Sequence, residues 1–203
     1  MRCLIVHAHP NPESFNAALC RQAASTLTDS GHHVDVLDLY QLDFDPCMSE
    51  HEHLNYDRLV DDGLLEPMVA EHVDLVTSAD ALIFVYPTWW AGLPAVLKGW
   101  LERVLLPGAA FELAPAGGGS GPVRVEPRLT NIRQLIGITT YGSSRLDTLV
   151  LGDAGRRTIR RTVRLVCNRR CKTAWLSLHR LDTSSPEQRA ELLDRVTRRL
   201  QAL

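Results

Sequence analysis

The chain has 203 residues, of which 45% are hydrophobic and 23% are charged, and its formal net charge is -2. This length and balance predict a globular protein with a sizeable core, and we expect a single domain over residues 1–203. A charge so close to zero argues against nucleic acid as a main partner, because phosphate binding needs a clear basic excess. No apolar run approaches the roughly 20 residues that a membrane span needs, and no signal-peptide pattern is present, so we expect a cytoplasmic protein without membrane insertion.

The first part of the chain alternates strand and helix patterns. Residues 2–8 are apolar and end at His-Pro-Asn-Pro, which predicts a short buried strand. Apolar residues recur at helical spacing over 14–28, and residues 33–39 alternate like a second strand. Residues 40–65 are polar and irregular, and long loops of this kind are often functional. A helical pattern follows over 67–78.

The second part of the chain continues the alternation around one long interruption. Residues 107–131 are rich in glycine and proline, with the glycines of 117–121 at the centre, and predict a mobile loop. The other patterns predict strands at 81–85, 133–139 and 172–178, and helices at 94–105, 156–166 and 186–200.

Five strands alternating with helices predict a doubly wound α/β fold with a parallel sheet and helices on both faces. Five strands suit the flavodoxin-like order 2-1-3-4-5 better than a six-stranded dinucleotide fold. In this order strands 1, 3 and 4 are neighbours, and ligands bind beyond the carboxyl ends of the strands at the switch point between strands 1 and 3. The segments that follow these three strands should therefore meet.

The segment after the first strand, residues 7–16, carries small polar side chains directly onto a helix N-terminus. Free N–H groups and the helix dipole favour a phosphate there, although Ser14 taken alone is explained as a helix cap. The segment contains neither G-x-x-x-x-G-K-[ST] nor G-x-G-x-x-G, so it supports neither a nucleotide triphosphatase nor a standard Rossmann site.

The other two segments contain aromatic and polar residues. Residues 86–94 include the adjacent Trp89 and Trp90. A tryptophan either packs in a core, where its N–H needs a partner, or forms a flat wall for an aromatic ligand, and the pattern leaves both open. Residues 139–144 are polar and contain a glycine, which suits either the polar edge of a heterocycle or an ordinary turn.

Two further features have competing interpretations. A basic run late in the chain is either a solvated helix face or a surface for anionic cofactor or partner groups. It comprises Arg156, Arg157, Arg160, Arg161, Arg164, Arg169 and Arg170. The five cysteines are scattered, as a reducing compartment tolerates. Cys167, Cys171 and His179 match no common zinc spacing, so we expect no metal site.

Four stretches occur in a recognisable order: His-Pro-x-Pro-x-Ser-Phe-Asn at 9–16, Tyr-Pro-x-Trp-Trp-x-Gly-x-Pro-Ala-x-Leu-Lys-Gly-Trp at 86–100, Pro-Gly-x-x-Phe at 107–111, and Thr-Thr-x-Gly at 139–142. Together they resemble the NAD(P)H:quinone oxidoreductase family of flavodoxin-like proteins. That family includes DT-diaphorase-like enzymes, modulators of drug activity and the ancillary flavoproteins of potassium efflux systems.

The resemblance implies a homodimeric flavoenzyme that takes a hydride from NAD(P)H and reduces a quinone-like acceptor by two electrons, in a ping-pong exchange. The implied cofactor is FAD, with FMN as the alternative. A different function, a flavin-binding regulatory subunit of a membrane transport system, is the alternative that the efflux relatives suggest.

The resemblance also implies roles for individual residues. The expected cofactor-binding residues are His9, Ser14, Phe15 and Asn16 at the flavin phosphate, Pro87, Thr88, Trp89 and Trp90 along the isoalloxazine, and Thr139, Thr140, Tyr141 and Gly142 on its other side.

The chain departs from the family pattern in two places. Tyr141 stands where relatives often have glycine, and we expect it to cap the flavin or narrow the acceptor pocket. The Tyr and His that DT-diaphorase-like enzymes place shortly afterwards are missing from 145–152. Arg145 is therefore our candidate for stabilising negative charge on the reduced flavin, together with Tyr141 as the second catalytic candidate.

Overall fold

A computed structural model describes residues 1–115 and 123–203, so the glycines at 117–121 lie outside the described residues. The main sheet has five parallel strands in the order β2-β1-β3-β6-β7. Its strands are β1 (Arg2–His7), β2 (His33–Asp38), β3 (Ala81–Thr88), β6 (Gln134–Tyr141) and β7 (Lys172–Leu178). This is the order 2-1-3-4-5 within the sheet, so the predicted flavodoxin-like fold is confirmed.

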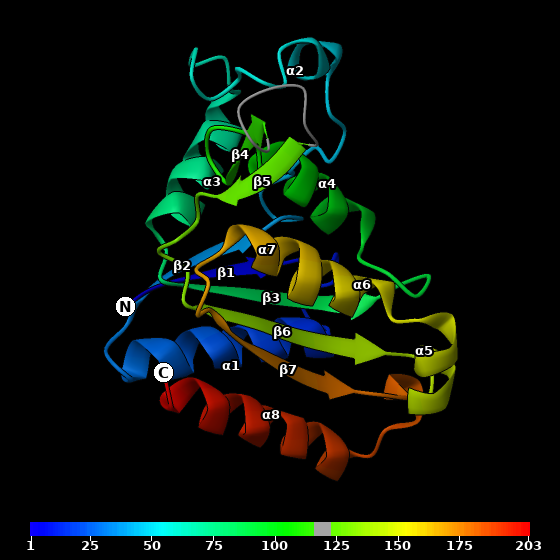
Figure 1. Ribbon diagram of the computed structural model, residues 1–203. Coiled ribbons are helices and arrows are strands. Elements are labelled where there is room, and N and C mark those ends of the chain that lie inside the picture. Colours follow the sequence, from blue (N-terminus) through cyan, green and yellow to red (C-terminus); the bar gives the residue numbers. More distant parts are fainter. Residues whose placement is uncertain (116–122) are drawn as a thin grey trace.

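Helices cover both faces of the sheet (Figure 1). One face packs against α1 (Phe15–Asp29) and α8 (Pro186–Gln201). The opposite face packs against α3 (Pro67–Ser78), α4 (Ala95–Val104) and a helical stretch formed by α6 (Ala154–Arg157), the π-helical turn η1 (Thr158–Val163) and α7 (Arg164–Val166).

The inner strands β1, β3 and β6 have continuous apolar runs over 3–6, 81–86 and 135–138, because both of their faces are buried. In β1, Leu4 and Val6 enter the core beneath α3 and α4, whereas Cys3 and Ile5 enter the core beneath α1 and α8. Each strand is thereby held from both sides, which gives the strand ends a rigid position.

The structure adds elements where the sequence predicted loops. Part of the 107–131 segment forms an antiparallel hairpin of β4 (Phe111–Pro115) and β5 (Val123–Pro127), so the prediction of a loop over the whole segment was wrong. The segment is rich in glycine and proline, but Phe111 and Val125 pack against the core and stabilise the pair of strands. Three short helices were also missed: α2 (Glu50–Leu54), α5 (Arg145–Leu151) and the 3-10 turn η2 (Leu181–Thr183).

Two strands run further than their apolar patterns indicated. β3 continues through Thr88 and β6 continues through Tyr141, and these two residues pair with each other in register. Pro87 and Thr88, predicted in a loop, thus belong to a strand. Within the described ranges, no helix has the length and apolar character that crossing a bilayer requires.

Candidate functional site

The ends of β1, β3 and β6 bring the three predicted segments together. The rings of His9 and Trp89 lie 5.9 Å apart between their centroids, which joins the first segment to the second. Asn16 Nδ2 donates to Thr140 Oγ1 at 2.7 Å, which joins the start of α1 to the end of β6. The hydroxyls of Thr88 and Thr139 are 3.1 Å apart. The expected meeting of these segments therefore occurs.

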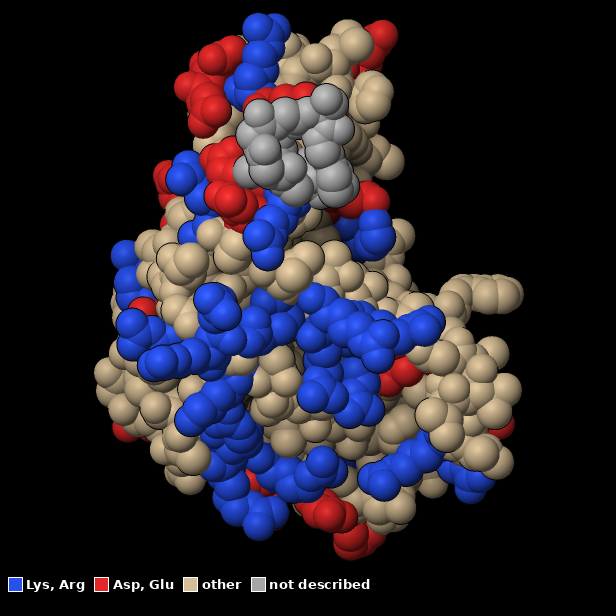
Figure 2. Space-filling view, viewed as in Figure 1, with Lys and Arg blue, Asp and Glu red and all other residues tan. Residues whose placement is uncertain are grey.

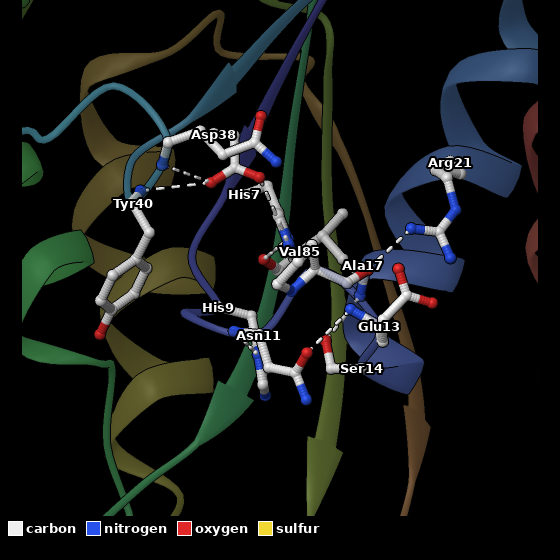
Figure 3. A network of polar contacts seen from close by, with 12 residues as sticks. His7, His9, Asn11, Glu13, Ser14, Ala17, Arg21, Asp38, Tyr40 and Val85 are labelled. Atoms are coloured by element: carbon white, nitrogen blue, oxygen red, sulfur yellow. Dashed lines mark hydrogen bonds and ion pairs between the residues drawn. The ribbon is translucent and has the colours of Figure 1, made fainter.

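The segment after β1 is folded onto itself by local hydrogen bonds (Figure 3). The backbone N–H of Asn11 donates to His9 Nδ1 at 3.0 Å, and that of Glu13 donates to Asn11 Oδ1 at 2.9 Å. Ser14 Oγ accepts from the backbone N–H of Ala17 at 3.1 Å, so Ser14 does cap α1. These bonds hold the loop in a defined shape at the helix N-terminus.

The first turn of α1 has unused polar groups. Within the described part of the chain, the backbone N–H groups of Phe15 and Asn16 make no hydrogen bond, as expected at the start of a helix. The Asn16 side chain is buried, and its Oδ1 also has no partner among those residues. Free N–H groups at a helix N-terminus suit a phosphate, and a buried amide oxygen suits a donor on a ligand.

Trp90 stands on a strained turn at the end of β3. The backbones of Trp89 and Gly92 bond to each other in both directions, at 3.3 and 2.9 Å. The two residues between them, Trp90 and Ala91, have φ values of 48° and 56°. Non-glycine residues adopt this left-handed region at a cost of about 1 kcal/mol or more. The result is a fully exposed Trp90 ring and a partly exposed Trp89 ring. Core packing is thus excluded for Trp90, and its role as a wall for an aromatic ligand stays a prediction.

Tyr141 is the last residue of β6; its ring is buried, and its hydroxyl both donates and accepts hydrogen bonds. The hydroxyl donates to the Asp153 carboxylate at 3.1 Å and accepts from Trp175 Nε1 at 3.3 Å. The ring stacks on His179, with 4.4 Å between centroids and 3° between planes. Burial, with the nearby Asp153 carboxylate, raises the pKa of Tyr141 far above its ordinary value. Tyr141 is therefore neutral at physiological pH.

Arg145 lies near the stacked rings of Tyr141 and His179. It begins α5, just after the Ser144 side chain that caps the helix, and it is exposed. Burial lowers the pKa of His179, and the positive charge of Arg145 lowers it further. The Arg156 charge acts on His179 in the same direction, so positive charge beside Tyr141 comes from arginines rather than from His179.

Two cavities meet at Tyr141. A cavity of about 210 Å³ lies between the Trp90 turn and the end of β6, with Thr88, Trp90 and Gly142 in its wall. A larger cleft of about 790 Å³ opens on the other side of Tyr141, between α5, the α6–η1 helix and β7. Both cavities include Tyr141, Thr148 and Asp153 in their walls. Of the predicted cofactor residues, Thr88, Trp90, Tyr141 and Gly142 line the smaller cavity. Tyr141 also lines the larger cleft, and the other predicted cofactor residues line neither.

Sequence reasoning missed Asp153, Trp175 and His179. Asp153 follows Gly152 and caps α6, since its carboxylate accepts from the N–H of Arg156 at 3.3 Å, and this cap pattern was a usable signal. Trp175 and His179 belong to β7 and its end, a strand outside the three whose loops were considered. The neighbouring β6–β7 register is what carries them to Tyr141.

Comparisons with known proteins agree with this architecture. A profile described as the flavodoxin-like fold matches residues 1–202. The crystal structure of Smu.1420 from Streptococcus mutans is 30% identical, covers 100% of both chains and superposes with a TM-score of 0.85. NAD(P)H:quinone oxidoreductase from Methanothermobacter marburgensis is 26% identical over 99% of this chain and 96% of its own, with a TM-score of 0.77.

Curated relatives match over part of their length. NAD(P)H dehydrogenase [quinone] 1 of Rattus norvegicus is 34% identical over 161 residues, which are 73% of this chain and 56% of that protein. A protein of Haemophilus influenzae named as an uncharacterized NAD(P)H oxidoreductase is 36% identical over 113 residues, which are 55% of this chain and 54% of that protein. The chain thus spans little more than half the length of these two curated relatives. With its fold, its motifs and the match over residues 1–202, the chain belongs to the flavodoxin-like family that includes the NAD(P)H:quinone oxidoreductases.

Proposed function

We propose that this protein is a flavin-dependent oxidoreductase that takes a hydride from NAD(P)H and reduces quinone-like acceptors by two electrons. The names of its relatives support NAD(P)H and quinones as substrates. The observation that carries the proposal is the meeting of a helix N-terminus with free N–H groups, an exposed Trp90 ring and the polar end of β6. A flavin needs these three kinds of contact, for its phosphate, its ring system and its polar edge.

Each part of the site has one task in this proposal. The N–H groups of Phe15 and Asn16, with Ser14 and His9 beside them, bind the phosphate of FAD or FMN. Trp89, Trp90, Pro87 and Thr88 flank the ring system on the β3 side. Thr139, Thr140, Tyr141 and Gly142 border it on the β6 side, where the buried Asn16–Thr140 hydrogen bond fixes the edge of the site.

A flavin held by the residues above would supply the redox chemistry: it would take a hydride from NAD(P)H and transfer a hydride to the acceptor, which takes a further proton from solvent. The chain supplies position and charge. Reductant and acceptor use the same side of the site in turn, so the exchange is ping-pong. Arg145 places a positive charge near the developing anion, and the neutral Tyr141 ring narrows the pocket beside Gly142.

We propose further that two copies of the chain assemble. Beside the exposed Arg145 and Asp147, α5 presents four apolar side chains to solvent: Leu146, Leu149, Val150 and Leu151 are each more than 60% exposed. In Figure 2 the surface over α5, at the right-hand edge, is mostly tan. Together with the exposed Trp90 this forms an apolar area beside the site, and a second copy that covers it would help to enclose the ligands.

The visible spectrum of the purified protein tests the function. We expect flavin bands that bleach when NADPH or NADH is added and return when a quinone is added. Heat release followed by chromatography then identifies the flavin as FAD or FMN. A protein that stays colourless after incubation with both flavins would overturn the proposal.

A further inference from the structure

The helical stretch from Ala154 to Val166 has one buried face and one strongly basic face. Gly155, Ile159 and Val163 point into the core. The outer face carries five arginines at helical spacing: Arg156, Arg157, Arg160, Arg161 and Arg164. Figure 2 shows a broad blue band across this side of the molecule, over the helix labelled α6 and α7 in Figure 1.

The cleft of about 790 Å³ beside Tyr141 lies against this basic face. Five arginines line it, and aromatic rings of β6 and β7 line it as well. The arginines are Arg145, Arg156, Arg157, Arg160 and Arg161. The cleft therefore combines dense positive charge with flat apolar walls.

Little in the protein balances this charge. Among the residues that the structure describes, none of the five arginines forms an ion pair with a carboxylate; Arg160 donates to the neutral Thr173 hydroxyl at 3.3 Å. Asp153 is the one acidic residue in the wall, and it is already bonded to Tyr141 and to the backbone of Arg156. Like charges this close repel within a Debye length, roughly 8–10 Å at physiological salt, so a bound polyanion would stabilise the cleft.

The walls favour an anion that carries a ring. The Tyr141 and His179 rings are stacked, and the Arg156 guanidinium lies 5.8 Å from the centre of the Trp175 ring. Guanidinium groups bind phosphate in a forked geometry, and guanidinium or aromatic planes stack on a base. A phosphorylated nucleoside uses both features, whereas a free phosphate uses only the first.

The position of the cleft points to a specific nucleotide. The cleft shares Tyr141, Thr148 and Asp153 with the smaller cavity beside Trp90, so an extended ligand can reach from one to the other. We propose that the cleft holds the phosphorylated adenosine end of NADPH, with the arginines of the α6–η1 helix contacting its 2′-phosphate. The protein would therefore prefer NADPH to NADH. This inference rests on the proposed function, since that function brings the reductant to the site.

Direct binding tests the inference without any turnover. Calorimetric titration with 2′,5′-ADP and with 5′-AMP compares ligands with and without the 2′-phosphate. We expect 2′,5′-ADP to bind at least about tenfold more tightly than 5′-AMP, because one additional charge-assisted contact has an effect of this size. We also expect the affinity for 2′,5′-ADP to fall as the salt concentration rises. In the double variant Arg157→Gln/Arg160→Gln we expect that advantage to fall at least about tenfold. Equal affinity for the two ligands, or an advantage that survives in the double variant, would overturn the inference.

The double variant Arg169→Gln/Arg170→Gln is the matched control, because it also removes two exposed positive charges, from a site outside the cleft. We expect it to bind 2′,5′-ADP like the unmodified protein, and thermal melting checks that all variants fold. In steady state, the ratio of kcat/KM for NADPH to that for NADH should fall about tenfold in the Arg157→Gln/Arg160→Gln variant and stay constant in the control. If flavin-loaded protein oxidises neither reductant, the proposed function fails. If it oxidises both and the ratio does not change, only this inference fails.

Discussion

At the scale of single residues, Trp90 offers the sharpest separation of function from stability. Its ring is fully exposed and packs against nothing in the described chain, so Trp90→Ala should change the free energy of unfolding by less than about 0.5 kcal/mol. The same change should weaken flavin binding or raise the KM for the acceptor about tenfold, since a stacked ring is lost. Flavin titration followed by fluorescence, with urea denaturation alongside, measures both. Trp100→Ala, at a buried ring, is the contrast and should destabilise by about 3–5 kcal/mol.

Arg145 is the second residue with a distinct prediction. If its charge stabilises the reduced flavin, Arg145→Ala should lower the reduction potential of the bound flavin and reduce turnover about tenfold. Arg145→Lys, which keeps the charge, should restore much of both. A dye-coupled redox titration and steady-state kinetics are the measurements. An alanine variant with unchanged potential and unchanged turnover would rule out this role.

At the scale of elements, one buried ion cluster ties α4 to the long loop between β2 and α3. The Arg103 guanidinium donates to Glu52 Oε1 at 2.8 Å, to Glu66 Oε2 at 2.6 Å and to the carbonyl of Asp45 at 2.6 Å. The Arg103 and Glu52 side chains are each only 3% exposed. The polar loop expected over 40–65 is thus anchored to α4 by Arg103. Composition shows that the loop is polar, but it cannot show which of its acidic residues binds Arg103.

Removing Arg103 should therefore be costly. Arg103→Ala leaves the Glu52 carboxylate buried without its partner, and we expect a loss of about 3–5 kcal/mol in the free energy of unfolding. Lys98→Ala provides a control on the same helix, because Lys98 and its partner Glu102 are about half exposed. That variant should lose less than about 0.5 kcal/mol. Urea denaturation distinguishes the two, and similar losses for both would contradict the role of the cluster.

At the scale of the whole molecule, histidines set the acid side of the stability profile. Burial lowers the pKa of His7, His9, His72 and His179. His72 illustrates the cause, because its Nδ1 accepts from Trp100 Nε1 at 3.3 Å and must be unprotonated to do so. A histidine whose pKa is lower in the folded state than in the unfolded state binds fewer protons when folded. Its contribution to the free energy of unfolding is therefore complete above the unfolded pKa, about 6.5, and is lost as the pH falls below it.

We therefore expect the melting temperature to fall by several degrees between about pH 7 and pH 5. Glu52 adds to the loss at lower pH: burial alone would raise its pKa, but hydrogen bonds from Ser49 and Arg103 outweigh burial and lower it. Calorimetric melts across this range test the expectation. A melting temperature that is constant or rises on acidification would contradict it.

Assembly belongs to the same scale. If the apolar surface of α5 is covered by a second copy, sedimentation should give a dimer at micromolar concentration, and Leu149→Glu should shift it toward monomer. Leu165→Glu is the matched control, because Leu165 is also an exposed leucine but lies on α7, outside that surface. A monomeric unmodified protein, or dimers unaffected by Leu149→Glu, would count against the homodimer.

By itself the sequence determined the alternation of strands and helices, the strand order within the sheet and the three segments that meet at its carboxyl edge. The alternation follows from local periodicity, because apolar runs such as β1 and β3 are typical of buried parallel strands. The strand order and the meeting of the three segments then follow from the topology of parallel sheets. Tertiary structure alone decided the β4–β5 hairpin, the surface position of Trp90 and the group formed by Tyr141, Asp153, Trp175 and His179. The group around Tyr141 depends on contacts between separate strands and helices, and the cap pattern at Asp153 marks a helix start without indicating those contacts. The position of Trp90 depends on a strained turn that the hydrogen bonds between Trp89 and Gly92 hold in place.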